Sequence, residues 1–201
     1  AASYGIGRRS QEEYVLESHR RAVHATETGF FKKEIVACPG LNTDGVFTLV
    51  DRDQSIRSDT SLDSMSRLSP AFLPKIGSVT AATSAPLSDG AAAMVVMSEA
   101  AARRYGLTPL VRVVSTAVVG VSPALMGLGP VYATRKVLRR SGLRLQEIEI
   151  VELNEAFAVQ AMACINELEL DHEIVNVHGG SLAIGHPLGA SGVRIATTLI
   201  H

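Results

Sequence analysis

The stretch GGSLAIGHPLGASG, residues 179–192, is the most informative part of the sequence. Five of its fourteen residues are glycine, and so many glycines are unfavourable unless the backbone turns tightly or approaches another group closely. His186 lies between Gly185 and Pro187, so a rigid turn before a helix would hold its imidazole in place for proton transfer or hydrogen bonding. The alternative is a glycine-rich strand-to-helix turn with a solvated histidine.

A second candidate, NEAFA at residues 154–158, lies where a predicted strand meets a predicted helix. An asparagine at such a junction commonly caps the helix. In an open α/β sheet the same position is at the carboxyl end of a strand, where binding sites are usually found. Asn154 is therefore either a helix cap or a carboxamide that leans over a pocket.

Hydrophobic periodicity predicts helices and strands in alternation. The first helix would begin at Ser10 and end near Gly29, and its loose apolar period and many basic residues indicate a surface position. Such alternation is typical of an α/β layered fold with a mostly parallel sheet. The predicted helices are 10–29, 99–105, 131–141, 155–170 and 191–200, and the predicted strands are 34–37, 91–97, 111–121, 148–153 and 175–177.

Three segments have compositions that bear on this prediction. Residues 91–97, AAAMVVM, have the length of a buried strand, although their alanines also suit a helix. Residues 111–121 are apolar and β-branched, as in a strand buried on both faces. Residues 41–77 are charged, serine-rich and turn-rich, so they form either a solvated connection or a ligand-binding excursion.

Composition and spacing exclude several classes of protein. Lys plus Arg number 19 against 20 Asp plus Glu among 201 residues, a formal net charge of -1, which argues against an electrostatic nucleic-acid binder. No apolar run reaches the roughly 18 residues that a membrane span needs. Cys38 and Cys164 cannot form a disulfide-rich scaffold, and neither has a sequence neighbour that would activate it as a nucleophile. The glycine order is neither a P-loop nor a dinucleotide fingerprint, and the histidines lack metal-ligand spacing, so no metal is expected.

The motifs at 154–158 and 179–192 resemble the two C-terminal signatures of thiolases, the acyltransferases that make or cleave 3-ketoacyl-CoA. Three further segments fit the family's order, LDSM at 62–65, SDGAAA at 88–93 and MGLGP at 126–130. The resemblance runs from around the first predicted helix to the last residue.

This resemblance implies an α/β, thiolase-like layered fold of mixed sheets with helices. Residues 1–86 would be part of the CoA-binding loop domain, 87–107 the last strand and helix of the N-terminal half, and 108–201 a truncated C-terminal half. The nucleophilic cysteine of the N-terminal half, and a second cysteine near the family's C-terminus, would both lie outside these residues.

The chemistry that the resemblance implies is a Claisen condensation and its thiolytic reverse, through an acyl-cysteine. His186 would activate the nucleophilic cysteine and direct Nε2 at the thioester oxygen, and Asn154 would hold a water that donates to the same oxygen. The pair would form an oxyanion hole for the enolate. No permanently bound cofactor is implied, because coenzyme A and acyl-CoA are substrates.

By the same resemblance, Arg57 would pack against the adenine of CoA, where an arginine can stack and also pair with phosphate. Ser64, Phe72 and Ala81 would lie beside the rest of the molecule.

The substrate pocket would be lined by Met126, Ala156 and Phe157. Ala85 stands where many thiolases have a serine that bonds the pantetheine, and the expected strand register turns the adjacent Ser84 elsewhere.

Three interpretations of function follow. The first is an acyltransferase that is active when complete, with the 201-residue chain inactive on its own. The second is a non-catalytic CoA-ester-binding or interaction subunit that needs another chain for the nucleophile. The third, a ketosynthase-type condensing enzyme, is disfavoured because those enzymes usually have a second histidine where Asn154 stands. The family further implies a homodimer or homotetramer with an acyl-CoA substrate and no nucleic-acid or membrane partner, and a cytoplasmic location is the default.

Overall fold

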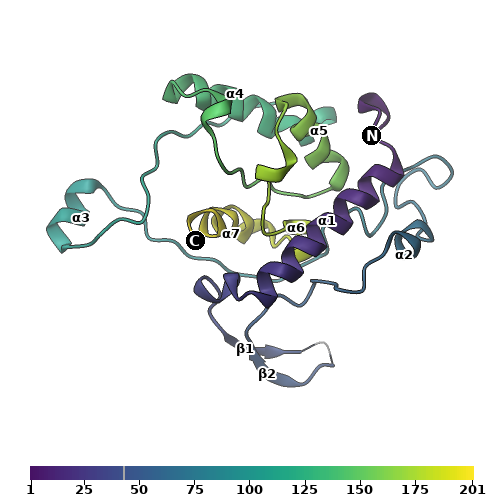
Figure 1. The fold of residues 1–201 in the computed structure, drawn as a ribbon, viewed down its shortest axis with the longest axis horizontal. Helices are drawn as coiled ribbons and strands as arrows, with labels where there is room; N and C mark the ends of the chain where they lie inside the picture. The colour runs from purple at the N-terminus through teal and green to yellow at the C-terminus, as the bar shows by residue number, and fades with distance from the viewer. Residues whose placement is uncertain (43) are drawn as a thin grey trace.

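The computed structural model describes residues 1–42 and 44–201, and helices dominate it, as Figure 1 shows. Of the helices in these ranges, none has the length and apolar character that a membrane crossing requires. The longer helices are α1 (Arg8–Glu27), α4 (Gly129–Ser141), α5 (Ala158–Leu168) and α7 (Leu188–Ile200). The shorter ones are α2 (Leu62–Ser66), α3 (Glu99–Tyr105) and α6 (Ser181–Ile184), with 3-10 turns η1 (Ala2–Tyr4), η2 (Phe30–Lys33), η3 (Pro123–Leu128), η4 (Leu145–Glu147) and η5 (His172–Ile174).

The core lies where α1 crosses the middle of the molecule and packs against α2, α5 and α6 (Figure 1). Val15 of α1, Ala158 and Cys164 of α5, and Val175 are each at most 1% exposed. Small and branched side chains therefore fill the space between these helices, and Cys164 serves as a small apolar residue, as the sequence predicted. This core fixes the elements that carry the two sequence motifs.

Helix α1 is buried along much of its length, so its predicted surface position is wrong. Gln11 and Glu12 are 0% and 2% exposed, and Arg21 is 8% exposed. Arg21 Nη1 donates to the carbonyl oxygens of His172 at 3.1 Å and Val175 at 2.8 Å. Apolar periodicity misses burial of this kind, because polar side chains are tolerated inside a protein when they have partners.

All five predicted helices are present, four of them with shifted ends. The helix α3 begins and ends as expected, with Ser98 Oγ accepting from the backbone N of Ala101 and Gly106 left-handed at its C-terminus. In α1, Gly7 is the N-cap instead of Ser10, which lies inside the first turn and donates to the Gly7 carbonyl at 2.9 Å.

Two predicted strands are extended but have no ladder partner in the described part of the chain. Residues 91–97 and 111–121 form the long connections from which α3 projects in Figure 1. The predicted burial is wrong, since residues 91–97 are exposed and Val118 is 84% exposed. The Val118 carbonyl accepts a hydrogen bond from Lys136 Nζ of α4 at 2.7 Å. A buried strand needs neighbouring strands on which to form its ladder, and no described segment takes that place.

The sheet of the described residues is a hairpin of β1 (Cys38–Leu41) and β2 (Phe47–Val50), paired antiparallel. The strand predicted at 34–37 is wrong in position, because pairing starts only at Cys38, one residue after the predicted end. At the turn, Asn42 Oδ1 accepts from the backbone N of Asp44 at 3.0 Å and of Val46 at 2.9 Å. The segment 41–77 therefore contains β2 and α2 and is more than a connection.

The predicted strands 148–153 and 175–177 meet at a single parallel bridge between Val151 and Val175. Next to the bridge, Asn176 uses both atoms of its amide on Leu153, accepting from its N at 2.7 Å and donating to its carbonyl at 2.8 Å. This pairing holds the residues before Asn154 against those that lead into α6. It thereby brings the two sequence motifs together.

Candidate active site

Asn154 and His186 lie side by side although 32 positions separate them in sequence. Asn154 Nδ2 is 3.3 Å from His186 Nε2. Asn154 follows the Val151 bridge and precedes α5, and His186 lies in the turn between α6 and α7. Both side chains are partly buried, so the structure unites the two residues that the sequence singled out.

Ser191 determines which nitrogen of His186 carries the proton. Its Oγ lies 2.6 Å from His186 Nδ1 and donates to the Pro187 carbonyl at 3.1 Å. Because a hydroxyl has one hydrogen, Oγ accepts from Nδ1–H. Nε2 is then the unprotonated nitrogen, and it accepts from Asn154 Nδ2. An imidazole in this tautomer can take up a proton at Nε2.

Gly185 permits the turn that presents His186. Its φ is +109°, a conformation that residues with side chains rarely adopt, and a Cβ here would lie 2.6 Å from Ser88 Oγ. The same Ser88 hydroxyl accepts from the backbone N of His186 at 3.0 Å. The close approach that the glycine content predicted occurs at this residue.

A cavity of about 360 Å³ lies between α1, α2, α6 and the segment 81–86. Val15, Met65 and Leu182 give it an apolar side. Serine and threonine hydroxyls, one imidazole and one guanidinium give it a polar side. Such a lining suits a ligand with a long neutral part and an anionic end.

Three of the four predicted CoA contacts, Arg57, Ser64 and Ala81, line this cavity. Phe72 does not, because it lies outside the lining and is 61% exposed.

His19 is a lining residue that sequence reasoning missed. Its Nδ1 accepts from the backbone N of Arg57 at 3.1 Å. Burial lowers the pKa of His19, the nearby Arg57 lowers it further, and Asp59 raises it. The imidazole thus anchors the backbone of the predicted adenine contact. No local signal marked it, since its helix was expected on the surface.

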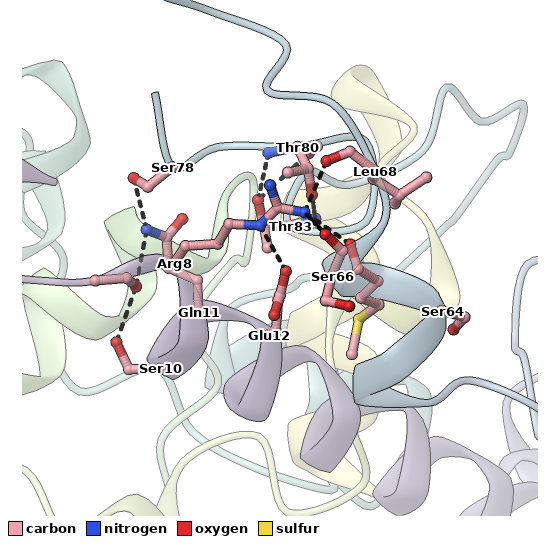
Figure 2. A network of polar contacts seen from close by, with 12 residues as sticks. Arg8, Ser10, Gln11, Glu12, Ser64, Ser66, Leu68, Ser78, Thr80 and Thr83 are labelled. Atoms are coloured by element: carbon pink, nitrogen blue, oxygen red, sulfur yellow. Dashed lines mark hydrogen bonds and ion pairs between the residues drawn. The ribbon is translucent and has the colours of Figure 1, made fainter. Parts of the chain in front are cut away.

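Arg8 of α1 binds the end of α2, which lines one side of the cavity, and Figure 2 shows the contacts of Arg8. Its Nη2 donates to the carbonyls of Met65 at 2.8 Å, Ser66 at 2.9 Å and Leu68 at 2.7 Å. These carbonyls lie at the end of α2, where helical acceptors lack intrahelical partners. Glu12, with a side chain 3% exposed, holds Arg8 Nε at 2.7 Å.

Of the residues predicted to line the substrate pocket, Ala156 and Phe157 contact the segment that borders the cavity, whereas Met126 is largely exposed. Phe157 is the N-cap of α5 and forms a bridge with Ser84, and the Ala156 carbonyl accepts from the backbone N of Ala85 at 3.0 Å. Met126 is 68% exposed. Ser84 lines the cavity, but its hydroxyl donates to the Thr80 carbonyl at 2.8 Å, so the expectation that it does not bond the pantetheine stays a prediction.

The Asn154–His186 pair lies next to this cavity without lining it. Ser55, which does line it, donates to the Ile184 carbonyl at 2.7 Å, two residues before His186. Neither thiol contacts the pair within the described ranges. Cys164 is 0% exposed, and burial raises its pKa, while Cys38 lies on the exposed hairpin.

Glu152 is a buried carboxyl close to the pair, with a side chain 4% exposed. Burial raises its pKa from 4.5 to about 7, Arg194 lowers it, and Glu155 and Glu34 raise it. The folded protein therefore binds this proton more tightly than the unfolded chain does. Between about pH 4.5 and pH 7, stability falls as the pH rises, because the unfolded state ionises first.

We expect Glu152→Gln to lose less unfolding free energy than the parent protein between about pH 5 and about pH 8, by roughly 2 to 3 kcal/mol. Urea unfolding at about pH 5 and about pH 8 measures it. The control is Glu13→Gln at an exposed carboxyl paired with Arg9. Equal pH dependence in Glu152→Gln and the parent protein would contradict the expectation.

Comparisons with known proteins point to one family. Residues 1–100 match the family model of the thiolase N-terminal domain, and residues 107–201 match that of the thiolase C-terminal domain. A 3-ketoacyl-CoA thiolase of Marinomonas sp. is 49% identical over 98% of this chain and 51% of its own length. One of Aeromonas salmonicida is 51% identical over 98% and 52%. The chain thus spans about half the length of the curated relatives it matches.

Solved structures give the same result. The Bacillus anthracis acetyl-CoA acetyltransferase superposes with a TM-score of 0.94 at 41% identity, covering 100% of this chain and 50% of that one. Human mitochondrial 3-ketoacyl-CoA thiolase superposes with a TM-score of 0.91 at 36% identity, again covering 100% of this chain and 50% of that one. These matches confirm the predicted thiolase-like α/β fold class, of which this chain covers about half. From its two domain matches, its relatives and its fold, the chain belongs to the thiolase family.

Proposed function

We propose that the protein containing this chain is an acyltransferase that makes or cleaves 3-ketoacyl-CoA by Claisen condensation and thiolysis with acetyl-CoA and CoA. The observation that carries the proposal is the Asn154–His186 pair, whose nitrogens lie 3.3 Å apart beside a ligand-sized cavity. The names of the relatives, 3-ketoacyl-CoA thiolase and acetyl-CoA acetyltransferase, supply the substrate class.

In this mechanism His186 acts first as a base. Its Nε2 takes the proton of the nucleophilic thiol, which a cysteine outside residues 1–201 supplies. The protonated Nε2 then donates to the thioester oxygen, and Asn154 contributes a second donor through a water. Negative charge develops on this oxygen only as the enolate forms, so each donor stabilises the transition state by about 2.7 to 4 kcal/mol.

The cavity provides a place for part of the CoA molecule. Arg57 and the hydroxyls of its polar side suit the phosphates and the amides of pantetheine, and Val15 and Leu182 suit its methylene groups. Ser64 and Ala81 line the same cavity. Phe72 would contact the outer part of the cofactor from the surface, and Met126, Ala156 and Phe157 would surround the acyl chain.

The same proposal assigns the parts of the chain. Residues 1–86 supply most of the cavity lining, which supports a role as part of a CoA-binding loop domain. Residues 87–107 would supply the last strand, which has no ladder partner among the described residues, and the helix α3 of the N-terminal half, and 108–201 would belong to the C-terminal half. A cytoplasmic homodimer or homotetramer in fatty acid metabolism completes the proposal.

The test is a thiolysis assay of the complete protein with CoA and 3-ketoacyl-CoA esters of several chain lengths, followed by chromatography of the products. We expect turnover by the complete protein and none by the 201-residue chain alone, because the nucleophile is supplied from outside it. Turnover by the isolated chain would contradict the missing nucleophile. CoA-ester binding by a complete protein that never turns over would favour a non-catalytic binding subunit instead.

A further inference from the structure

A hydrogen-bond chain from α7 through α6 ends on Asn154. Arg194 Nη2 donates to Ser181 Oγ at 3.2 Å, and Ser181 Oγ donates to Asn154 Oδ1 at 2.7 Å. The other atom of the same amide, Asn154 Nδ2, faces His186 Nε2. Both ends of the carboxamide are thus engaged, one by a donor and one by an acceptor.

The direction of this chain follows from the chemistry of its members. An arginine side chain only donates, so Ser181 Oγ uses a lone pair for Arg194 and its single hydrogen needs an acceptor elsewhere. Ser181 is 0% exposed, which leaves water no access to that hydrogen. Asn154 Oδ1 accepts it. A buried hydroxyl hydrogen without an acceptor would be unfavourable, so Arg194 excludes the arrangement in which Ser181 accepts from Asn154 Nδ2.

We propose that Arg194 is a positioning residue that fixes the orientation of the Asn154 carboxamide, so that its NH2 group faces His186 and can donate to the water that acts on the reacting oxygen. The inference rests on the proposed function. With the amide reversed, Oδ1 would face the unprotonated Nε2 of His186, two acceptors would oppose each other, and the water would lose its donor. Arg194 therefore acts on the reaction through Ser181, without touching the substrate.

The surroundings of Arg194 leave it available for this role. Its side chain is 19% exposed, and among the described residues its hydrogen bond is the one to Ser181. Its Nη1 has no hydrogen-bond partner in the described ranges and lies 3.6 Å from Glu152 Oε2, which also has none. The competing explanation is a purely structural ion pair between Arg194 and Glu152. The two explanations differ in what they predict for Asn154.

The experiment compares Arg194→Met and Arg194→Lys in the complete protein. We expect Arg194→Met to lower kcat for thiolysis by about tenfold or more, with KM within about twofold, since one orientation of an oxyanion donor is lost. Arg194→Lys should recover most of kcat, because an ammonium also only donates. Arg9→Met, at an exposed arginine on α1, is the matched control. Loss of kcat that merely follows a lowered unfolding midpoint would overturn the proposal.

A double-mutant cycle separates positioning from structure. In an Asn154→Ala background, Arg194→Met should change kcat by less than about twofold, because the group that it orients is gone. The same fold loss in both backgrounds would overturn the proposal.

A third readout is independent of thiolase activity, so failure of the inference and failure of the proposed function can be told apart. Nuclear Overhauser contacts between the Asn154 NH2 protons and the ring protons of His186 are expected in the parent protein and in Arg194→Lys. They should be lost in Arg194→Met. Their absence from the parent protein, or their persistence in Arg194→Met, would overturn the orientation whatever reaction the site performs.

Discussion

Replacing His186 by alanine in the complete protein is expected to lower kcat for thiolysis by about 10³-fold or more. The residue has two successive tasks, taking the thiol proton at Nε2 and then donating to the thioester oxygen. The tautomer set by Ser191 leaves Nε2 unprotonated for the first task. KM should change little, because the cavity that receives CoA is lined by other residues.

Steady-state kinetics on His186→Ala and Asn154→Ala measure this. Asn154→Ala should cost about 10²-fold in kcat, since it removes one donor and no base. His24→Ala, an exposed histidine on α1, is the control and should leave kcat unchanged. Removing the imidazole is not expected to unfold the turn, because the backbone N of His186 donates to Ser88 Oγ. A His186→Ala enzyme within about tenfold of the parent kcat would exclude the proposed mechanism.

Local patterns predicted the helices well and the sheet poorly. Caps and stop signals such as Ser98 and Gly106 act within a few residues, so sequence alone placed α3 correctly. A strand depends on a distant partner, and residues 111–121 have strand composition but no described neighbour to pair with. No hairpin is predicted from the sequence despite the Asp44-Gly45 turn signal, because few periodic apolar residues flank it in a segment interpreted as either a connection or a ligand-binding excursion.

In the candidate site, too, some residues could be predicted from local sequence and others could not. The motifs identified Asn154 and His186, which lie together in the structure. The residues that orient them, Ser181 and Ser191, are unremarkable serines in helices, and only folding makes them neighbours of the amide and the imidazole. His19 was hidden for the same reason. Burial of polar groups by distant partners has no local sequence signature.

Glu155→Ala is expected to lower the free energy of unfolding by at least about 3 kcal/mol, the largest stability effect of any single change proposed for this chain. Glu155 is 1% exposed. Its Oε1 accepts from Tyr14 Oη at 3.0 Å and Asn176 Nδ2 at 2.8 Å, and its Oε2 accepts from Ser18 Oγ at 2.8 Å and the backbone N of Leu182 at 3.2 Å. Truncation would leave four buried donors unsatisfied at once, and those donors come from α1, the segment after the Val175 bridge, and α6.

Urea unfolding followed by far-UV circular dichroism measures this effect, with Glu13→Ala at an exposed ion pair as the control, expected within about 1 kcal/mol of the parent. Glu155→Gln separates shape from acceptor chemistry. The free energy of unfolding of Glu155→Gln should lie between those of the parent protein and Glu155→Ala, because an amide keeps one accepting oxygen but turns an NH2 group toward two of the donors. Gly180 packs directly against this carboxyl, since a Cβ on Gly180 would overlap Glu155 Cδ. If Glu155→Ala and Glu13→Ala were equally stable, the buried carboxyl would not be what ties α1 and α6 to the loop that presents Asn154.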